Sequence, residues 1–195
     1  MKNLLRCLLA LSVGVLAADK PRLGHTPEQL RPFLEAKTWT VISLDPMEVI
    51  EGRQLPFDDP FGSPPPGSKE VEAAPASPKP KLKPDQIFHD YPILGKHTLP
   101  VTPEMRLIIQ DLDRAGRLSG GDGMPACYFP RHGIRVVDGG RVYDLQICYQ
   151  CSIANLYVGN ERAGGFHFHD KSPQAPNPNA LNAILKKAGV KMSPH

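Results

Sequence analysis

Hydrophobic positions along the chain repeat with two different periods, which together predict an α+β fold. Helical spacing occurs in three segments, beginning at Pro27, at Pro103 and near Asn179. Their apolar stripes are Leu30, Phe33 and Leu34; Met105, Ile108, Ile109 and Leu112; and Leu181, Ile184, Leu185 and Ala188. We expect the first helix to end near Lys37 and the others at Gly116 and Gly189, because glycine is favoured just after a helix.

Runs of β-branched and aromatic residues predict strands between these helices. The clearest pair flanks Asp138-Gly139-Gly140, a strong turn signal, and forms a β-hairpin. We expect an antiparallel sheet with a cysteine-bearing β-hairpin, packed by about three helices. Its strands are Trp39–Leu44, Tyr91–Leu99 with a candidate bulge at Gly95, Ile134–Val137, Arg141–Cys148, Leu156–Val158 and Phe166–Phe168.

The N-terminus has the form of a cleaved secretory signal peptide covering residues 1–17. Lys2 and Arg6 provide the basic start, Cys7–Leu16 is an apolar run of ten positions, and cleavage falls after Ala17 or Ala18. Ten helical residues span about 15 Å, roughly half of a bilayer core, so a membrane anchor is not favoured. We expect export to the periplasm or the extracellular medium, without stable membrane insertion after cleavage.

The segment from Pro56 to Pro84 differs in composition from the rest of the chain. It holds nine of the 22 prolines, with Gly, Ser, Ala and Lys between them. Such a segment has too few apolar residues to offset the cost of ordering it, so we expect a disordered insert. The expected organisation is therefore the signal peptide at 1–17, an N-terminal helix and strand at 18–55, the proline-rich insert at 56–84, and the main α+β domain at 85–195.

Removal of the signal peptide changes the charge balance. The whole chain has 23 basic and 20 acidic residues, and loss of Lys2 and Arg6 leaves 21 against 20, a net charge of +1. A nearly neutral chain has no electrostatic footprint for a polyanion. The composition therefore excludes nucleic acid as an expected partner.

Cleavage also reduces the cysteines from four to three, because Cys7 is lost and Cys127, Cys148 and Cys151 remain. With Asp138-Gly139-Gly140 as a three-residue loop, Cys127 lies opposite Cys151, whereas a two-residue turn shifts this register. An exported chain favours oxidised thiols. We expect a structural disulfide between Cys127 and Cys151, or alternatively between Cys127 and Cys148, with the third cysteine buried.

Two other uses of these cysteines compete with the structural disulfide. One is a zinc site of three thiolates and one histidine, in which Cys148-x-x-Cys151 forms the knuckle. Its ligands would be Cys127, Cys148, Cys151 and His132, with His167 or His169 as the alternative fourth ligand. The other is thiol–disulfide exchange by Cys148 and Cys151, although no clear helix follows to lower a thiol pKa. A Cys–His nucleophile using His132 lacks a visible orienting third group.

The strings around these residues resemble a group of small exported bacterial proteins whose activity is uncharacterised. The match rests on Cys127-Tyr128-Phe129-Pro130-Arg131-His132-Gly133-Ile134-Arg135 and on Ile147-Cys148-Tyr149-Gln150-Cys151, where the group has Phe in place of Tyr149. Shorter similarities are Ser43-Leu44-Asp45-Pro46, Leu94-Gly95-Lys96 and Ala188-Gly189-Val190. The resemblance covers most of the chain outside the signal peptide and the insert. It implies a shared fold and assigns no activity.

From the sequence we therefore expect an exported globular domain that acts as a non-catalytic module stabilised by a disulfide. The alternative is a metal-binding or thiol-redox protein that uses Cys148-x-x-Cys151. No catalytic residue and no resident cofactor are assigned, and zinc belongs only to the metal-binding alternative.

Overall fold

The computed structural model describes residues 27–47, 82–119, 128–168 and 175–193. These residues form three α-helices, which are α1 (Pro27–Glu35), α2 (Pro103–Leu118) and α3 (Asn179–Lys187), and one short 3-10 helix (Pro84–Gln86). They also form seven strands: β1 (Thr38–Leu44), β2 (Ile87–Phe88), β3 (Tyr91–Pro100), β4 (His132–Asp138), β5 (Arg141–Cys148), β6 (Ile153–Val158) and β7 (Glu161–His167).

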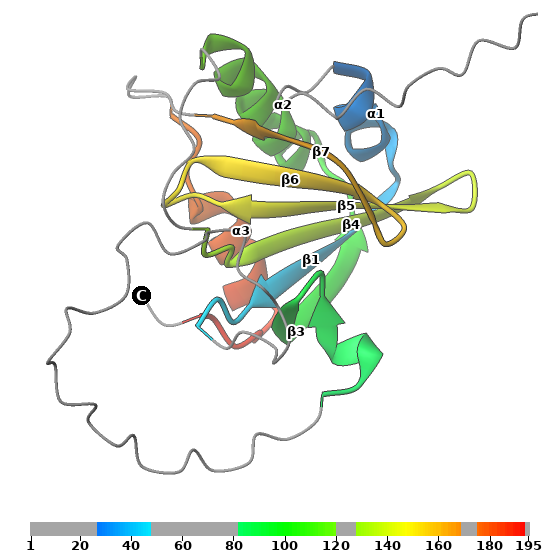
Figure 1. The fold of residues 1–195 in the computed structure, drawn as a ribbon, viewed down its shortest axis with the longest axis vertical. Coiled ribbons are helices and arrows are strands. Elements are labelled where there is room, and N and C mark those ends of the chain that lie inside the picture. The colour runs from blue at the N-terminus through cyan, green and yellow to red at the C-terminus, as the bar shows by residue number, and fades with distance from the viewer. Residues whose placement is uncertain (1–26, 48–81, 120–127, 169–174, 194–195) are drawn as a thin grey trace, which may run out of the picture.

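The strands make one antiparallel sheet in the order β2-β3-β1-β4-β5-β6-β7 (Figure 1). Strand β1 lies between β3 and β4, so a segment from near the start of the described chain becomes central to the sheet. From β4 to β7 the strands follow one another as a meander. The α+β class predicted by the hydrophobic pattern is confirmed.

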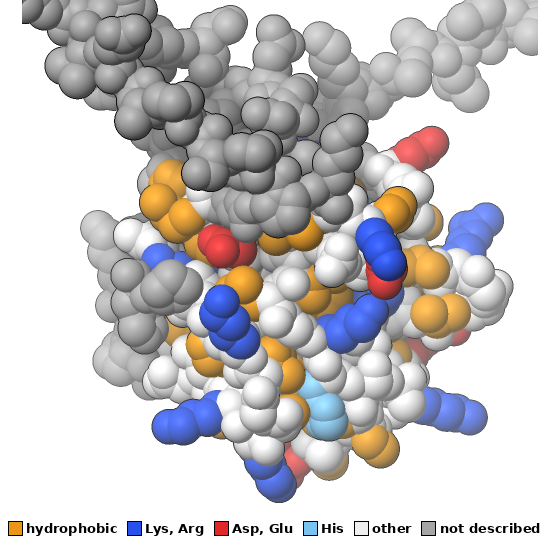
Figure 2. Space-filling view, turned by 90° about the horizontal axis from the view of Figure 1, so that it is seen from below, with side chains coloured by type: hydrophobic (Ala, Val, Ile, Leu, Met, Phe, Trp, Pro, Cys, Tyr) orange, Lys and Arg blue, Asp and Glu red, His pale blue; other side chains and the backbone are white. Residues whose placement is uncertain are grey.

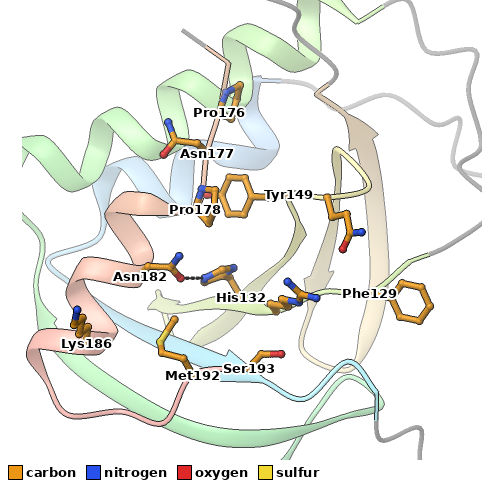
Figure 3. A pocket seen from close by; sticks show the side chains of 12 residues that line it. Phe129, His132, Tyr149, Pro176, Asn177, Pro178, Asn182, Lys186, Met192 and Ser193 are labelled. Carbon is orange, nitrogen blue, oxygen red and sulfur yellow. Dashed lines mark hydrogen bonds between the residues drawn. The ribbon is translucent and has the colours of Figure 1, made fainter. Parts of the chain in front are cut away.

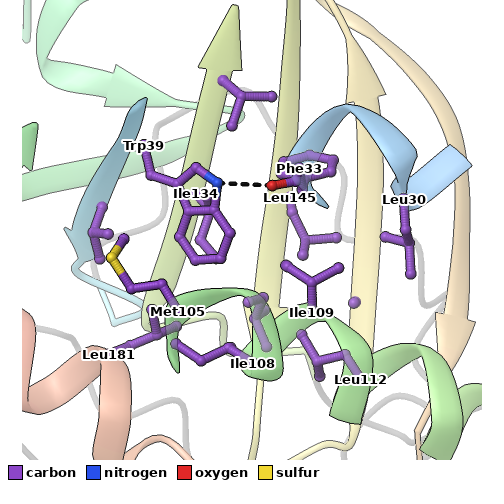
Figure 4. Packing of buried hydrophobic residues seen from close by; sticks show 14 of the residues in the cluster. Leu30, Phe33, Trp39, Met105, Ile108, Ile109, Leu112, Ile134, Leu145 and Leu181 are labelled. Atoms are coloured by element: carbon purple, nitrogen blue, oxygen red, sulfur yellow. Dashed lines mark hydrogen bonds between the residues drawn. The ribbon is translucent and has the colours of Figure 1, made fainter. Parts of the chain in front are cut away.

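The three helices pack against one face of the sheet and enclose the main hydrophobic core (Figure 4). Trp39 on β1 is fully buried, and its Nε1–H donates to the carbonyl of Phe33 at 2.9 Å, which ties the end of α1 to the sheet. The predicted apolar stripe of α2 is confirmed, because Met105, Ile108, Ile109 and Leu112 are all buried. Residues of β4 to β7 that alternate toward this face complete the core, including Ile134, Leu145 and Phe166.

The central hairpin differs from the expected one by one residue. Asp138 pairs with Arg141, and Gly139 and Gly140 form a two-residue turn with φ of +54° and +78°. Positive φ at both turn positions matches the twist of antiparallel strands and favours glycine. The expected three-residue loop is therefore wrong, and with it the register that set Cys127 opposite Cys151.

The helix boundaries follow the expected signals with one exception. The Thr102 hydroxyl caps α2 by accepting from Met105 N–H at 3.4 Å. This helix continues past its expected end at Gly116 to Leu118, closed by Ser119 N–H donating to the carbonyl of Ala115 at 3.0 Å. The predicted stop of the last helix is confirmed, because Gly189 has a φ of +67° directly after α3.

Several expectations fall on residues that the structure does not describe. These are the signal peptide, the insert up to residue 81, Cys127 and His169. No helix within the described ranges is long and apolar enough to cross a membrane. On the face shown in Figure 2, basic side chains are spread over the visible described surface and do not gather into one patch.

Candidate functional site

Unsatisfied polar atoms mark one region of the molecule. In the described part of the chain, four buried side-chain polar atoms have no hydrogen-bond partner: Ser43 Oγ, Arg131 Nε, His132 Nδ1 and Tyr149 Oη. Three of these residues line the same pocket, and the fourth, Ser43, is the register partner of His132 across β1 and β4. Because buried polar groups are normally paired, their gathering at one place needs an explanation.

The pocket has a volume of about 710 Å³ and lies between the start of β4, the turn after β5, and α3. In Figure 3, Tyr149, His132 and Met192 surround its interior, Asn182 and Lys186 project from α3, and Phe129 stands at the opposite end. Small-molecule sites commonly have volumes of about 300–1,000 Å³. The pocket is therefore large enough for a ligand of that kind.

His132 is placed in the pocket by the pleat of β4. It points to the helical face of the sheet, is 4% exposed, and its Nε2 lies 2.7 Å from Oδ1 of Asn182 on α3. An amide oxygen only accepts, so Nε2 carries the proton and Nδ1 presents a lone pair. Burial lowers the pKa of His132 from 6.5 to about 4, and this outweighs the opposing effect of the Asn182 hydrogen bond. The imidazole is consequently neutral near pH 7.

Tyr149 lies in the turn between the two cysteines and closes another side of the pocket. Its ring packs edge-on against His132 at 5.5 Å and against Phe168 at 5.7 Å between ring centroids. Burial raises the pKa of the Tyr149 hydroxyl above its usual value, and the charge of Asp111 adds to the rise. The hydroxyl therefore stays protonated and can donate to a bound group.

The charged residues of the lining are basic. Arg131 and Lys186 contribute two cations, and no Asp or Glu is among the described residues that line the pocket. Arg131 lies directly before β4, and its Nε–H is one of the buried donors without a partner. Phe129, Met192, Pro176 and Pro178 supply apolar surface to the same pocket.

The disulfide forms the base of the turn that carries Tyr149. The structure joins Cys148 to Cys151, not either cysteine to Cys127 as we expected from the sequence, and Cys127 itself is not among the described residues. The predicted pairing depended on the incorrect hairpin register. Cys148 and Cys151 are 1% and 8% exposed, and Cys151 Sγ accepts from Phe129 N–H at 3.4 Å. The disulfide thus holds two pocket residues, Tyr149 directly and Phe129 through this hydrogen bond.

The structure brings together only some of the residues expected for a metal site. Cys148 and Cys151 are bonded to each other, and His132 uses one ring nitrogen for Asn182. His167 alternates with the buried Phe166 and Phe168 and so leaves the opposite face of the sheet. Within the described ranges, no group of three or more His, Cys, Asp or Glu residues could hold a metal ion.

The opposite face of the sheet carries a buried polar network that the sequence did not reveal to us. Asp144 on β5 is fully buried and accepts from Arg135 Nε at 2.8 Å and Nη2 at 2.7 Å. His89 Nε2 lies 2.7 Å from Oδ2 of Asp144. The imidazole ring of His89 stacks on the ring of Tyr157, with 3.6 Å between the ring centroids. Although burial opposes ionisation, hydrogen bonds from Arg135 and His89 hold the pKa of Asp144 below its ordinary value. These mutually satisfied groups form a structural ion cluster.

Asn182 and Tyr149 are two of the pocket residues that sequence reasoning missed. Asn182 lies between Leu181 and Leu185 in sequence, next to the apolar stripe of α3. A polar residue at the edge of such a stripe is the sequence signal that could have identified Asn182 as a candidate. Tyr149 stands in the sequence only as the position where the resembling group has Phe, which does not indicate a pocket residue.

Comparison of the chain with protein-family models, with curated proteins and with solved structures gave no match.

Proposed function

We propose that this chain is an exported, non-catalytic module that binds a small molecule in the pocket between β4, the Cys148–Cys151 turn and α3. Three unpartnered buried polar atoms, Arg131 Nε, His132 Nδ1 and Tyr149 Oη, belong to residues that line this pocket, and they carry the proposal. Each unsatisfied buried donor or acceptor costs about 1–3 kcal/mol. A bound molecule with matching groups would recover part of that free energy.

Export is the part of the proposal that rests on the sequence. Residues 1–17 have the basic, apolar and small-residue regions of a signal peptide. The Cys148–Cys151 disulfide is consistent with an oxidising compartment, where such bonds persist.

The arrangement favours binding over hydrolysis. Ser43, His132 and Asn182 together contain the residue types of a hydroxyl nucleophile, a base and an orienting group. However, Ser43 is completely buried and is not part of the pocket lining, and its hydroxyl makes no hydrogen bond to His132. A substrate in the pocket would not reach this hydroxyl, so we assign the three unpartnered polar atoms of the lining to recognition.

Thiol–disulfide exchange is the second candidate, because the Cys148-x-x-Cys151 pair is oxidised. Two observations favour a structural bond instead. Both cysteines are buried, and Cys151 is followed by strand β6 with no helix N-terminus that would lower a thiol pKa. A reduction potential below about −300 mV is expected for a structural disulfide, whereas a value near −200 mV would favour exchange.

A fragment screen tests the proposal without knowledge of the natural ligand. Ligand-observed NMR with a library of neutral, cationic and anionic aromatic fragments compares the wild-type protein with His132→Leu and with the control His97→Leu. His97 lies on β3, outside the pocket lining. We expect a set of mutually competing fragments that bind the wild type and the control but not His132→Leu.

Two results would contradict the proposal. One is a library without any competing set of binders. The other is a set of fragments that binds folded His132→Leu as well as it binds the wild type. Circular dichroism of each variant establishes that the fold is retained.

A further inference from the structure

The chemistry of the pocket lining identifies a class of ligand, an inference that rests on the proposed function. We propose that the pocket recognises a small molecule with an oxyanion head group, carboxylate or phosphate, attached to a flat apolar body. Arg131 binds the head group, Lys186 and the Tyr149 hydroxyl contribute a charge and a donor from other sides of the lining, and the body packs against Phe129 and Met192.

The first argument is the sign of the charge. The described lining contains the cations Arg131 and Lys186 and no carboxylate. Asp111 on α2 raises the pKa of the Tyr149 hydroxyl from outside the lining. A cationic ligand would therefore meet two like charges, and an anionic ligand would meet two opposite ones.

The second argument is the kind of hydrogen-bonding atom that is left unsatisfied. Arg131 Nε–H is a buried donor without a partner, and Tyr149 Oη–H is a second one. Guanidinium groups form their strongest hydrogen bonds with carboxylate and phosphate oxygens. These two unpartnered donors match the acceptor-rich oxygens of such a head group.

His132 supplies the one acceptor among the unpartnered atoms of the lining. Because Nε2–H donates to Asn182, Nδ1 offers a lone pair and suits a hydroxyl or a protonated phosphate oxygen on the ligand. The groups that face this imidazole are Arg131, Tyr149 and Asn182. His132 therefore adds specificity for a proton-bearing group beside the anionic one.

The third argument is the apolar part of the lining. Phe129, Met192 and two prolines, Pro176 and Pro178, form surface that an ion alone would leave uncovered. Phe129 is a large apolar residue that is 39% exposed, so its ring is available for contact. With a volume of about 710 Å³, the pocket has room for a ring system in addition to the head group.

Four naphthalene probes that share the ring system and carry different head groups provide the test. These are 2-naphthoate, 2-naphthyl phosphate, 2-naphthamide and 2-naphthylmethylamine, with affinities measured by isothermal titration. We expect naphthoate or naphthyl phosphate to bind at least about tenfold more tightly than the amide and the amine. The ratio between the first two distinguishes a carboxylate ligand from a phosphate ligand.

Variants assign the effect to the named residues. Arg131→Gln should abolish the preference for the anionic probes, and Lys186→Gln should weaken their binding about two- to fivefold. Lys187→Gln is the matched control, because Lys187 is equally exposed in the last turn of α3 but does not line the pocket. It should leave all affinities unchanged. Lys186→Gln keeps the test valid if Arg131→Gln does not fold.

The possible outcomes separate this inference from the proposed function. If the amide or the amine binds as tightly as the anions, the proposed preference for an oxyanion is refuted, but the proposed ligand-binding function of the pocket is not. The same conclusion follows if none of the four probes binds but the fragment screen still yields ligands that His132→Leu loses. If Lys186→Gln and Lys187→Gln weaken the anions equally, the head group is not held where we place it. Failure of the screen itself would refute the binding function.

Discussion

The imidazole of His132 is hydrogen-bonded to Asn182, with 2.7 Å between Nε2 and Oδ1, across fifty positions of sequence. This contact joins the central sheet to α3 at the wall of the pocket. It also determines which ring nitrogen is available to a ligand, because Nε2 is hydrogen-bonded to Asn182 and Nδ1 has no hydrogen-bond partner.

Loss of the Asn182 amide should destabilise the protein. Asn182→Ala leaves the buried Nε2–H of His132 without an acceptor, for which we expect a loss of about 1–3 kcal/mol in the free energy of unfolding. Urea denaturation measures it. Asn179→Ala is the control, because Asn179 is exposed at the start of the same helix. Equal losses in the two variants would show that the hydrogen bond contributes nothing specific.

Stability should decrease between neutral and acid pH because of His132. Its pKa is about 4 in the folded protein and near 6.5 in the unfolded chain, so only the unfolded chain gains a proton at this residue between these values. Protonation therefore favours unfolding, and the contribution that is complete above pH 6.5 is lost as the pH falls toward 4. We expect a loss of about 3 kcal/mol.

Urea denaturation of the wild type and of His132→Phe at both ends of this range isolates the contribution. The carboxylates, including Asp144, affect both proteins alike and cancel in the comparison. A wild type that loses no more stability than His132→Phe would contradict the prediction.

Removal of the Cys148–Cys151 disulfide should weaken both the fold and the pocket. The bond closes a loop with a sequence separation of 3. Loop-closure entropy then gives about 2 kcal/mol of stabilisation, and we expect this loss in the Cys148→Ser/Cys151→Ser double variant. Because the turn carries Tyr149, affinity for 2-naphthoate should fall as well.

Mass spectrometry provides the check on the bond itself. Reduction of the wild type should add two hydrogens that the double variant does not gain. Unchanged affinity in the double variant would show that the disulfide does not shape the pocket.

The ion cluster on the other face should contribute to stability and not to binding. Asp144→Asn removes the charge of the fully buried carboxylate that contacts Arg135 and His89. Breaking a fully buried pair costs about 3–5 kcal/mol, and because the Arg135 side chain is 42% exposed we expect a smaller loss of about 1–3 kcal/mol. Asp138→Asn, at the exposed end of β4, is the control and should have little effect. Thermal unfolding measures both. A small effect of Asp144→Asn would mean that the cluster is open to water.

The parts of the fold that local sequence determines were predictable. The stripe of Met105, Ile108, Ile109 and Leu112 identified α2, and Asp138-Gly139-Gly140 identified the central hairpin. The length of the turn was not predictable, because the sequence Asp138-Gly139-Gly140 is compatible with both a two-residue and a three-residue loop. That single residue changed the register, and with it the expected cysteine pairing.

The site was only partly predictable for a related reason. His132 could be chosen as a candidate from the sequence, but its partner Asn182 lies on a helix that packs beside it only in the folded chain. The Asp144 cluster likewise joins β4, β5 and the turn after β2 through contacts between distant segments. Periodicity shows which face a residue occupies and does not show which distant residue lies next to it.

Methyl NMR of methionine gives the most direct test of the central claim that the pocket beside α3 binds an anionic small molecule. Met192 lines the pocket, whereas Met105 on α2 is buried in the core and does not line it. On addition of 2-naphthoate, we predict a saturable shift of the Met192 methyl signal, an unchanged Met105 signal, and a much smaller Met192 response to 2-naphthamide. A Met192 signal that stays fixed under saturating naphthoate, or that moves equally with the amide, would contradict the account.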